Sequence, residues 1–121
     1  MEAEIRRGWH AQIDQLAQLP VGWNDVGSAP MDPEIIAAAH RLAYELPTTA
    51  GEHARIMPLA RGCLQWEYRR GKRSLELEFE SPTQLRFYQC DPTERFDNEE
   101  CFPTHDRTTL ARLVAWFAGE G

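Results

Sequence analysis

Long apolar runs and a secretory leader are both missing from this sequence. No stretch approaches the roughly 20 consecutive apolar residues that a helix needs to cross a bilayer. The first 30 residues contain no cationic start followed by an apolar run and a small-residue cleavage site. We therefore expect a cytoplasmic protein that does not insert into a membrane.

Cysteine is scarce, and the short motifs of common catalytic sites are missing. The three cysteines, Cys63, Cys90 and Cys101, are an odd number in a chain long enough to fold without disulfides, so we expect reduced thiols. The chain contains no G-x-S-x-G, P-loop or G-x-G-x-x-G motif. Cys63 has no adjacent histidine or helix start to lower the pKa of its thiol. These absences predict a non-enzymatic protein with no catalytic residues and no cofactor.

The charge of the chain is acidic overall and unevenly spread. Its 121 residues are 42% apolar and 26% charged with a net charge of −6, a balance typical of one globular domain over residues 1–121. Residues 1–50 carry −4, residues 51–90 carry +2 and residues 91–121 carry −4. An acidic protein is repelled by nucleic-acid phosphates unless a basic patch lies apart on one face. We therefore do not expect nucleic acid as the main partner.

Two segments near the N-terminus have the apolar period of helices. The first, residues 2–18, places four apolar side chains on one helical face and ends before Pro20: Ile5, Trp9, Ile13 and Leu16. A second helix is predicted for residues 33–46. Asp32 can accept hydrogen bonds from its first free N–H groups, and Pro33 suits the first helical position.

From residue 54 onward the apolar period changes from helical to two. Apolar and polar side chains alternate in residues 64–69, 75–80 and 85–88, and a shorter strand is predicted for residues 55–58. Alternation in consecutive short segments joined by tight turns is typical of an antiparallel meander with one buried and one wet face.

The C-terminal part contains an aperiodic segment and one further helix. Residues 91–103 contain two prolines and five acids against one arginine, so we expect a loop there. Thr104 or Asp106 then caps a last helix that ends at Gly119. The predicted fold class is α+β in the order α-α-β-β-β-β-α, a four-stranded antiparallel meander with helices packed on one face.

Cys90, Cys101 and His105 form the pattern C-x10-C-x3-H, which raises the question of a metal site. Structural zinc is usually held by four ligands in two closely spaced pairs, because each pair must converge on one tetrahedral ion. Only Cys101 and His105 lie close together in the sequence. We therefore expect no bound metal.

Acidic side chains gather in two places that could contact a partner protein. In the predicted loop at residues 91–100, Phe96 lies within a negative run, as an interface anchor with a charged rim would; alternatively, its ring packs on the core. On the predicted sheet, three glutamates share one face, where they could meet a charged partner or be solvated, with Arg69, Arg73 and Arg86 as cross-strand partners. The predicted contact residues for a partner with a basic surface are Glu76, Glu78, Glu80, Glu94, Phe96, Asp97, Glu99 and Glu100.

A basic cluster offers an alternative function. Arg69, Arg70, Lys72 and Arg73 lie at one predicted hairpin tip, where four cations could contact a nucleic-acid backbone. Hairpin tips are also where charge is most easily solvated, and the flanking glutamates would oppose a polyanion. Nucleic-acid binding through these residues is therefore the second hypothesis, after protein binding.

Residues 19–34, LPVGWNDVGSAPMDPE, resemble the LP-x-GW-[DN]-x-x-G-[AS]-x-P-x-x-P segment of short uncharacterised bacterial proteins. The resemblance continues into a helix, a strand like residues 62–67 and an acidic alternating strand like residues 75–80, and so covers about residues 15–80. It carries no assigned activity. Because such proteins belong to accessory gene sets of bacteria or phages, it implies a partner-binding role such as inhibitor, antitoxin, immunity or anti-defence protein. Within this segment, we expect Trp23 to pack between the first two helices; the alternative is a ring that faces a ligand pocket, as in an enzyme or a small-ligand module.

Overall fold

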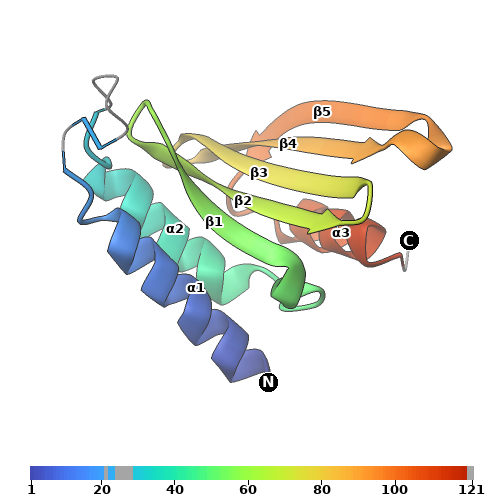
Figure 1. Ribbon diagram of the computed structural model, residues 1–121, viewed down its shortest axis with the longest axis horizontal. Helices are drawn as coiled ribbons and strands as arrows, with labels where there is room; N and C mark the ends of the chain where they lie inside the picture. Colours follow the sequence, from blue (N-terminus) through green and yellow to red (C-terminus); the bar gives the residue numbers. More distant parts are fainter. Residues whose placement is uncertain (21, 24–28, 120–121) are drawn as a thin grey trace.

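A computed structural model describes residues 1–20, 22–23 and 29–119 of the chain. Two helices come first, a five-stranded sheet follows, and a third helix ends the fold (Figure 1). The elements in order are α1 (Glu2–Leu16), α2 (Pro33–Glu45), the short 3-10 helix η1 (Gly51–His53), β1 (Ala54–Leu59), β2 (Cys63–Arg70), β3 (Arg73–Ser81), β4 (Gln84–Asp91), the 3-10 helix η2 (Pro92–Glu94), β5 (Phe96–Pro103) and α3 (Arg107–Ala118). None of the described helices is long and apolar enough to cross a membrane.

The sheet is an antiparallel meander in the order β1-β2-β3-β4-β5. The α+β class and the antiparallel arrangement are confirmed, but the predicted number of four strands is wrong. Residues 96–103, predicted as loop, pair with β4 from Asp91↔Phe96 to Gln84↔Pro103. Seven of the eight β5 residues are exposed, so the strand lacks the buried and exposed alternation by which the other strands were recognised.

All three helices pack against one face of the sheet (Figure 1). Alternate residues of a strand point to opposite faces, and the buried hydrophobic residues of β2, β3 and β4 follow this period. The sheet's buried hydrophobic residues on the helix side are Ile56, Leu64, Trp66, Tyr68, Leu75, Leu77, Phe79, Leu85, Phe87 and Phe102. We call the opposite side of the sheet, which carries Glu76, Glu78 and Glu80, the outer face.

The helices begin where the sequence predicts. The Asp32 carboxylate accepts a hydrogen bond from the Glu34 N–H at 2.8 Å, and Pro33 occupies the first turn of α2. Asp106 accepts from the backbone N–H and the hydroxyl of Thr109 at 3.1 and 2.7 Å, and these bonds lower the pKa of its carboxyl group. At the other end of α3, Gly119 adopts the left-handed conformation with φ of 85°.

The C-terminal ends of α2 and α3 lack a basic residue in their last turns and are capped by arginines from elsewhere. Arg6 of α1 donates to the carbonyl oxygens at the end of α2, namely those of Ala43, Tyr44 and Leu46, at 2.7, 2.9 and 3.0 Å. Arg70 donates to the Phe117 carbonyl at 2.8 Å, and Arg73 donates to the Trp116 carbonyl at 2.6 Å. Each guanidinium therefore satisfies free carbonyls and the negative end of a helix dipole.

The segment before α2 is bound to the turn between β1 and β2. The Ala29 N–H donates to the Ala60 carbonyl at 3.1 Å, and the Asp32 N–H donates to the Gly62 carbonyl at 3.0 Å. Trp23 is half-buried, and its indole N–H is buried. The rest of the predicted motif at residues 21 and 24–28 lies outside the described residues.

Candidate functional site

The outer face carries the three glutamates predicted on β3 and a fourth from β2. Strand register places Glu67 of β2 directly opposite Glu76 of β3, Tyr88 of β4 opposite Glu76, and Glu99 of β5 opposite Tyr88. Three carboxylates thus share one row across the sheet. Partial burial raises the pKa of Glu76, and the nearby charges of Glu67 and Glu78 raise it further.

Arginines partly neutralise this face. Arg86 contacts Glu80 at 2.6 Å and Glu99 at 3.0 Å, which links β3, β4 and β5. Glu78 pairs with Arg61 at 2.8 Å, and Glu67 pairs with Arg69 at 3.4 Å. Among the described residues Glu76 has no ion-pair partner.

Arg73, expected among these cross-strand partners, lies on the other face. Its guanidinium contacts the Asp91 carboxylate at 2.9 Å and lies over the Trp116 ring, 4.7 Å from the centroid. Hydrogen bonding from Arg73 holds the pKa of the Asp91 carboxyl below its usual range. The expectation placed Arg73 wrongly because the side chains of a strand alternate, and Arg73 has the same parity as buried Leu75.

The acidic residues predicted on the loop lie instead on η2 and β5 of the antiparallel hairpin that β4 and β5 form, which we call the β5 hairpin. Asp97 and Glu99 pair with outer-face residues of β4, so their side chains join the outer face. Phe96 and Glu100 have the opposite parity and point to the helix side. Glu94, in η2, lies at the hairpin end.

Phe96 is neither fully free nor buried. Its ring lies 5.7 Å from the ring of Trp116 on α3, and 38% of the residue is exposed. One side of the ring thus packs on α3 while the rest faces solvent, and the interface anchor stays a prediction. Within the described part of the chain, its hairpin neighbours Glu94, Asp97 and Glu100 form no ion pair.

The basic hairpin tip is divided between two environments. Arg70 and Arg73 are bonded to the end of α3, and Arg70 also lies 5.2 Å from the centre of the Phe117 ring. Lys72 in the turn and Arg69 on the outer face are exposed, as is Arg70 despite its bond to α3. A phosphate contact by all four cations would therefore require Arg70 and Arg73 to leave the carbonyls that they cap.

The cysteine and histidine residues considered for metal binding do not converge. Cys90 is opposite Asp97 and Cys101 is opposite Arg86, so the two cysteines lie four residues apart along the hairpin, about 13 Å at the rise of a strand. Across residues 1–20, 22–23 and 29–119 there is no group of three histidine, cysteine or acidic side chains able to hold a metal ion.

Helices α1 and α2 bring together three polar side chains in a row, His10, His40 and Asp14, which the sequence did not predict as a group. His10 Nδ1 lies 2.7 Å from His40 Nδ1, and His40 Nε2 lies 3.0 Å from an Asp14 carboxylate oxygen. The two ring planes are nearly parallel, at 14° to each other. Stacked faces would keep all atoms of the two rings about 3.5–4.0 Å apart. Because the two nitrogens are only 2.7 Å apart, they form a hydrogen bond in the plane of the rings. The sequence shows that His10 and Asp14 lie four residues apart and so share one face of α1. It does not show that both contact His40 of α2.

The contact between His10 and His40 needs one proton between the two nitrogens. A second proton would set two N–H donors against each other, because both ring nitrogens of a charged histidine are donors. Burial lowers the pKa of His10, as do His40 and Arg6, while Asp14 raises it. The ring of Tyr44, 4.5 Å away on α2, completes the surroundings.

The histidine pair predicts a loss of stability on mild acidification. Because the pKa of His10 is lowered from 6.5 in the folded state, the unfolded chain binds the proton more readily. The free energy of unfolding should therefore fall as the pH drops through 6.5 and level off below the folded pKa. Urea unfolding at about pH 7.5 and pH 5.5 measures the change, which His10→Asn should reduce.

Other groups with shifted pKa values change the stability at a different pH or in the opposite direction, so their effects can be told apart from that of His10. Asp91 and Asp106, with pKa values lowered from 3.8, lose their contribution only at more acidic pH. Glu76, whose pKa is raised, changes stability in the opposite direction. An equal pH dependence in the wild type and in His10→Asn would contradict the assignment to the histidine pair.

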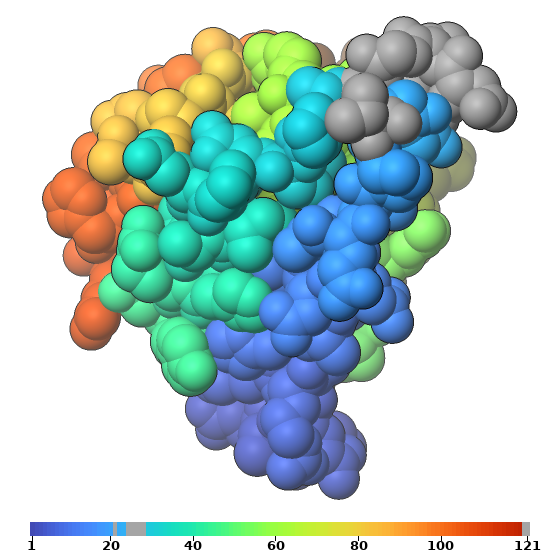
Figure 2. Space-filling view, turned by 90° about the vertical axis from the view of Figure 1, so that its left-hand side faces the viewer, coloured from blue at the N-terminus to red at the C-terminus, as the bar shows by residue number. Residues whose placement is uncertain are grey.

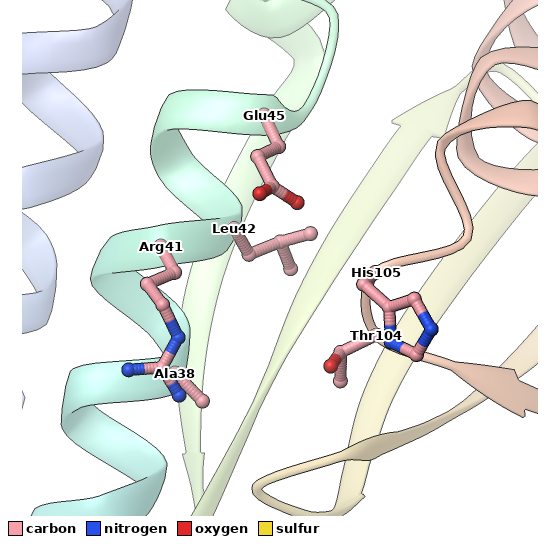
Figure 3. A pocket seen from close by; sticks show the side chains of 6 residues that line it. All are labelled: Ala38, Arg41, Leu42, Glu45, Thr104 and His105. Carbon is pink, nitrogen blue, oxygen red and sulfur yellow. The ribbon is translucent and has the colours of Figure 1, made fainter.

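A groove runs along α2 beside the corner between β5 and α3 (Figures 2 and 3). Two hollows of about 350 and 120 Å³ share Arg41 and Glu45 as lining residues. The other lining residues are Ala38, Leu42, Tyr44, Thr104, His105 and Arg107. Glu45 already contacts Arg107 at 3.4 Å, so opposite charges in this groove pair with each other.

Comparison of the chain with protein-family models, curated proteins and solved structures gives no match.

Proposed function

We propose that this protein acts by binding another protein rather than by catalysing a reaction. The observation that supports this most directly is the β5 hairpin. It presents a half-exposed aromatic ring, Phe96, together with acids that have no ion-pair partner in the described part of the chain: Glu94, Asp97 and Glu100. An aromatic anchor with a charged rim is a common composition for a protein interface.

Phe96 and Glu100 point to the helix side of the hairpin, whereas Asp97 and Glu99 connect it to the outer face, which adds further carboxylates. The carboxylates of the outer face come from β2, β3 and β5, and several are paired with arginines that are themselves partly exposed. Exposed ion pairs contribute little to stability, so a partner's cations can replace the intramolecular ones at small cost. We propose a partner with a basic surface, because complementary charge speeds association and selects among partners.

The biological role that we propose follows the resemblance of residues 15–80 to short bacterial proteins of accessory gene sets. It is that of an inhibitor, an antitoxin or immunity protein, or an anti-defence protein, working in the cytoplasm without a cofactor.

Affinity capture from extracts of the native cells, followed by calorimetry with the captured protein, tests this function. The triple reversal of Glu94, Asp97 and Glu99 to lysine should weaken binding at least about tenfold, and added salt should weaken binding of the wild type. A matched control reverses Glu4, Glu34 and Glu52, three exposed acids of α1, α2 and η1. It changes the net charge equally and should leave affinity within about twofold.

Two results would contradict the proposal. One is the capture of no protein in stoichiometric amount. The other is an equal loss of affinity in both triple variants, which would mean that net charge alone governs association.

A further inference from the structure

The two edges of the sheet differ in what they offer to another strand. An edge strand presents unpaired backbone N–H and C=O groups that can pair with a further chain. At the β1 edge, the Ile56 N–H already donates to the Gln12 side-chain oxygen of α1 at 3.0 Å. Alternate residues of an antiparallel edge strand point their N–H groups the same way, so Pro58 occupies the next outward position and has no N–H to offer.

At the β5 edge, one outward N–H group is engaged among the described residues, and its acceptor is a side chain of β5 itself rather than of another element. The backbone N–H of Glu99 donates to the Asn98 side-chain oxygen at 3.0 Å and not to β4. This N–H group therefore points away from β4. By the same alternation, Asp97 and Cys101 also direct their N–H groups outward. Seven of the eight residues of the strand are exposed. The edge of β5 therefore directs three N–H groups outward in a row, and an added strand would replace the Asn98 side chain as the acceptor for Glu99.

Charge selects the chain that would pair with this edge. Asp97 and Glu99 lie on one side of the strand and Glu100 on the other, so an added strand meets carboxylates on both sides. In a second copy of this protein, β5 would set these acids against each other, and like charges on paired strands are destabilising. A segment with lysine or arginine would instead gain cross-strand ion pairs.

We infer that β5 binds an extended basic segment of the partner protein as an additional antiparallel or parallel strand. This inference rests on the proposed function and names its mode: backbone hydrogen bonds provide the alignment, and the acidic side chains select a cationic sequence. Carboxylates on an edge strand also protect against unwanted pairing, and an experiment with matched peptides separates the two roles.

The probe is a capped synthetic peptide of about ten residues that alternates lysine and valine, a length that covers one strand. Its control has the same side chains but carries a methyl group on every backbone nitrogen, so it has equal charge and no backbone N–H donors. We expect the first peptide to slow amide hydrogen exchange of Asp97, Glu99 and Cys101 at least about tenfold and to bind at least about tenfold more tightly than the control.

Substitution of one outward position tests the same edge from the protein side. Cys101→Pro removes an N–H group that makes no bond to β4, and proline is tolerated at such positions of an edge strand. It should weaken binding of the lysine–valine peptide about tenfold. Cys101→Val keeps the N–H and should bind as the wild type does.

The outcomes distinguish this inference from the proposed function. Equal binding of both peptides, or unchanged exchange at the three amides, would overturn strand addition while leaving the acidic surface as a docking site. No binding of either peptide at millimolar concentration would also overturn it, whereas the capture and charge-reversal experiment decides the proposed function separately.

Discussion

Trp66→Ala is expected to lower the free energy of unfolding by about 3–5 kcal/mol, the usual cost of removing a large aromatic side chain from a core. Trp66 is fully buried on β2, the strand between β1 and β3, and pairs with Ile56 and Leu77. Its ring meets Trp9 of α1 edge-on, with centroids 6.0 Å apart and planes at 81°. The residue therefore joins the sheet to the first helix.

Packing rather than hydrogen bonding accounts for this expected loss. The indole N–H of Trp66 is buried and finds no acceptor in the described part of the chain, so its removal breaks no bond there. A total stability of about 5–15 kcal/mol is typical of a domain, so this single change could remove a large fraction of it. Urea unfolding followed by far-ultraviolet circular dichroism measures the difference.

A surface aromatic provides the control. Tyr44 on α2 is 71% exposed, and Tyr44→Ala should cost less than about 1 kcal/mol. If Trp66→Ala cost no more than Tyr44→Ala, the contact between sheet and α1 would not have the central role that its burial indicates.

Gly62→Ala is expected to be the second most damaging change, with a loss of about 2–5 kcal/mol from left-handed strain and overpacking together. Gly62 has φ of +81° in the turn between β1 and β2. A β-carbon there would lie 2.6 Å from the Pro30 carbonyl oxygen. Because that atom belongs to the backbone of the segment bound to this turn, the segment itself would have to move.

Gly71→Ala is a matched control for the strain alone. Gly71 has φ of +59° in the turn between β2 and β3, and no described atom lies within 4 Å of an added β-carbon. It should cost about 1–2 kcal/mol. Equal losses in the two variants, measured by chemical unfolding, would show that the segment before α2 does not depend on its contact with Gly62.

These two glycines show the limit of reading a motif locally. The sequence predicted turns at both positions, because glycine accepts positive φ. It did not predict that one turn is open to solvent and the other holds the Pro30–Asp32 segment. That difference depends on residues about thirty positions apart, which only the folded chain brings together.

The sequence predicted which residues make up the acidic surface, but it did not predict that part of this surface is a strand. The alternating glutamates of β3 were placed correctly on one face because strand periodicity is a local property. β5 was missed because backbone hydrogen bonds to β4 hold it, and every residue except proline can make these, whatever its side chain. Consequently the acidic segment is an edge strand with a defined direction rather than a loop.

The sequence by itself determined the helix starts, four of the strands and the buried face of the sheet, since caps and apolar periods act within a few residues. Only the tertiary structure decided the use of the arginines and histidines. Arg6, Arg70 and Arg73 cap distant helices, and His10 meets His40 across two helices. A long charged side chain can reach any carbonyl or carboxylate that the fold brings near, so its partner depends on the whole chain rather than on its neighbours.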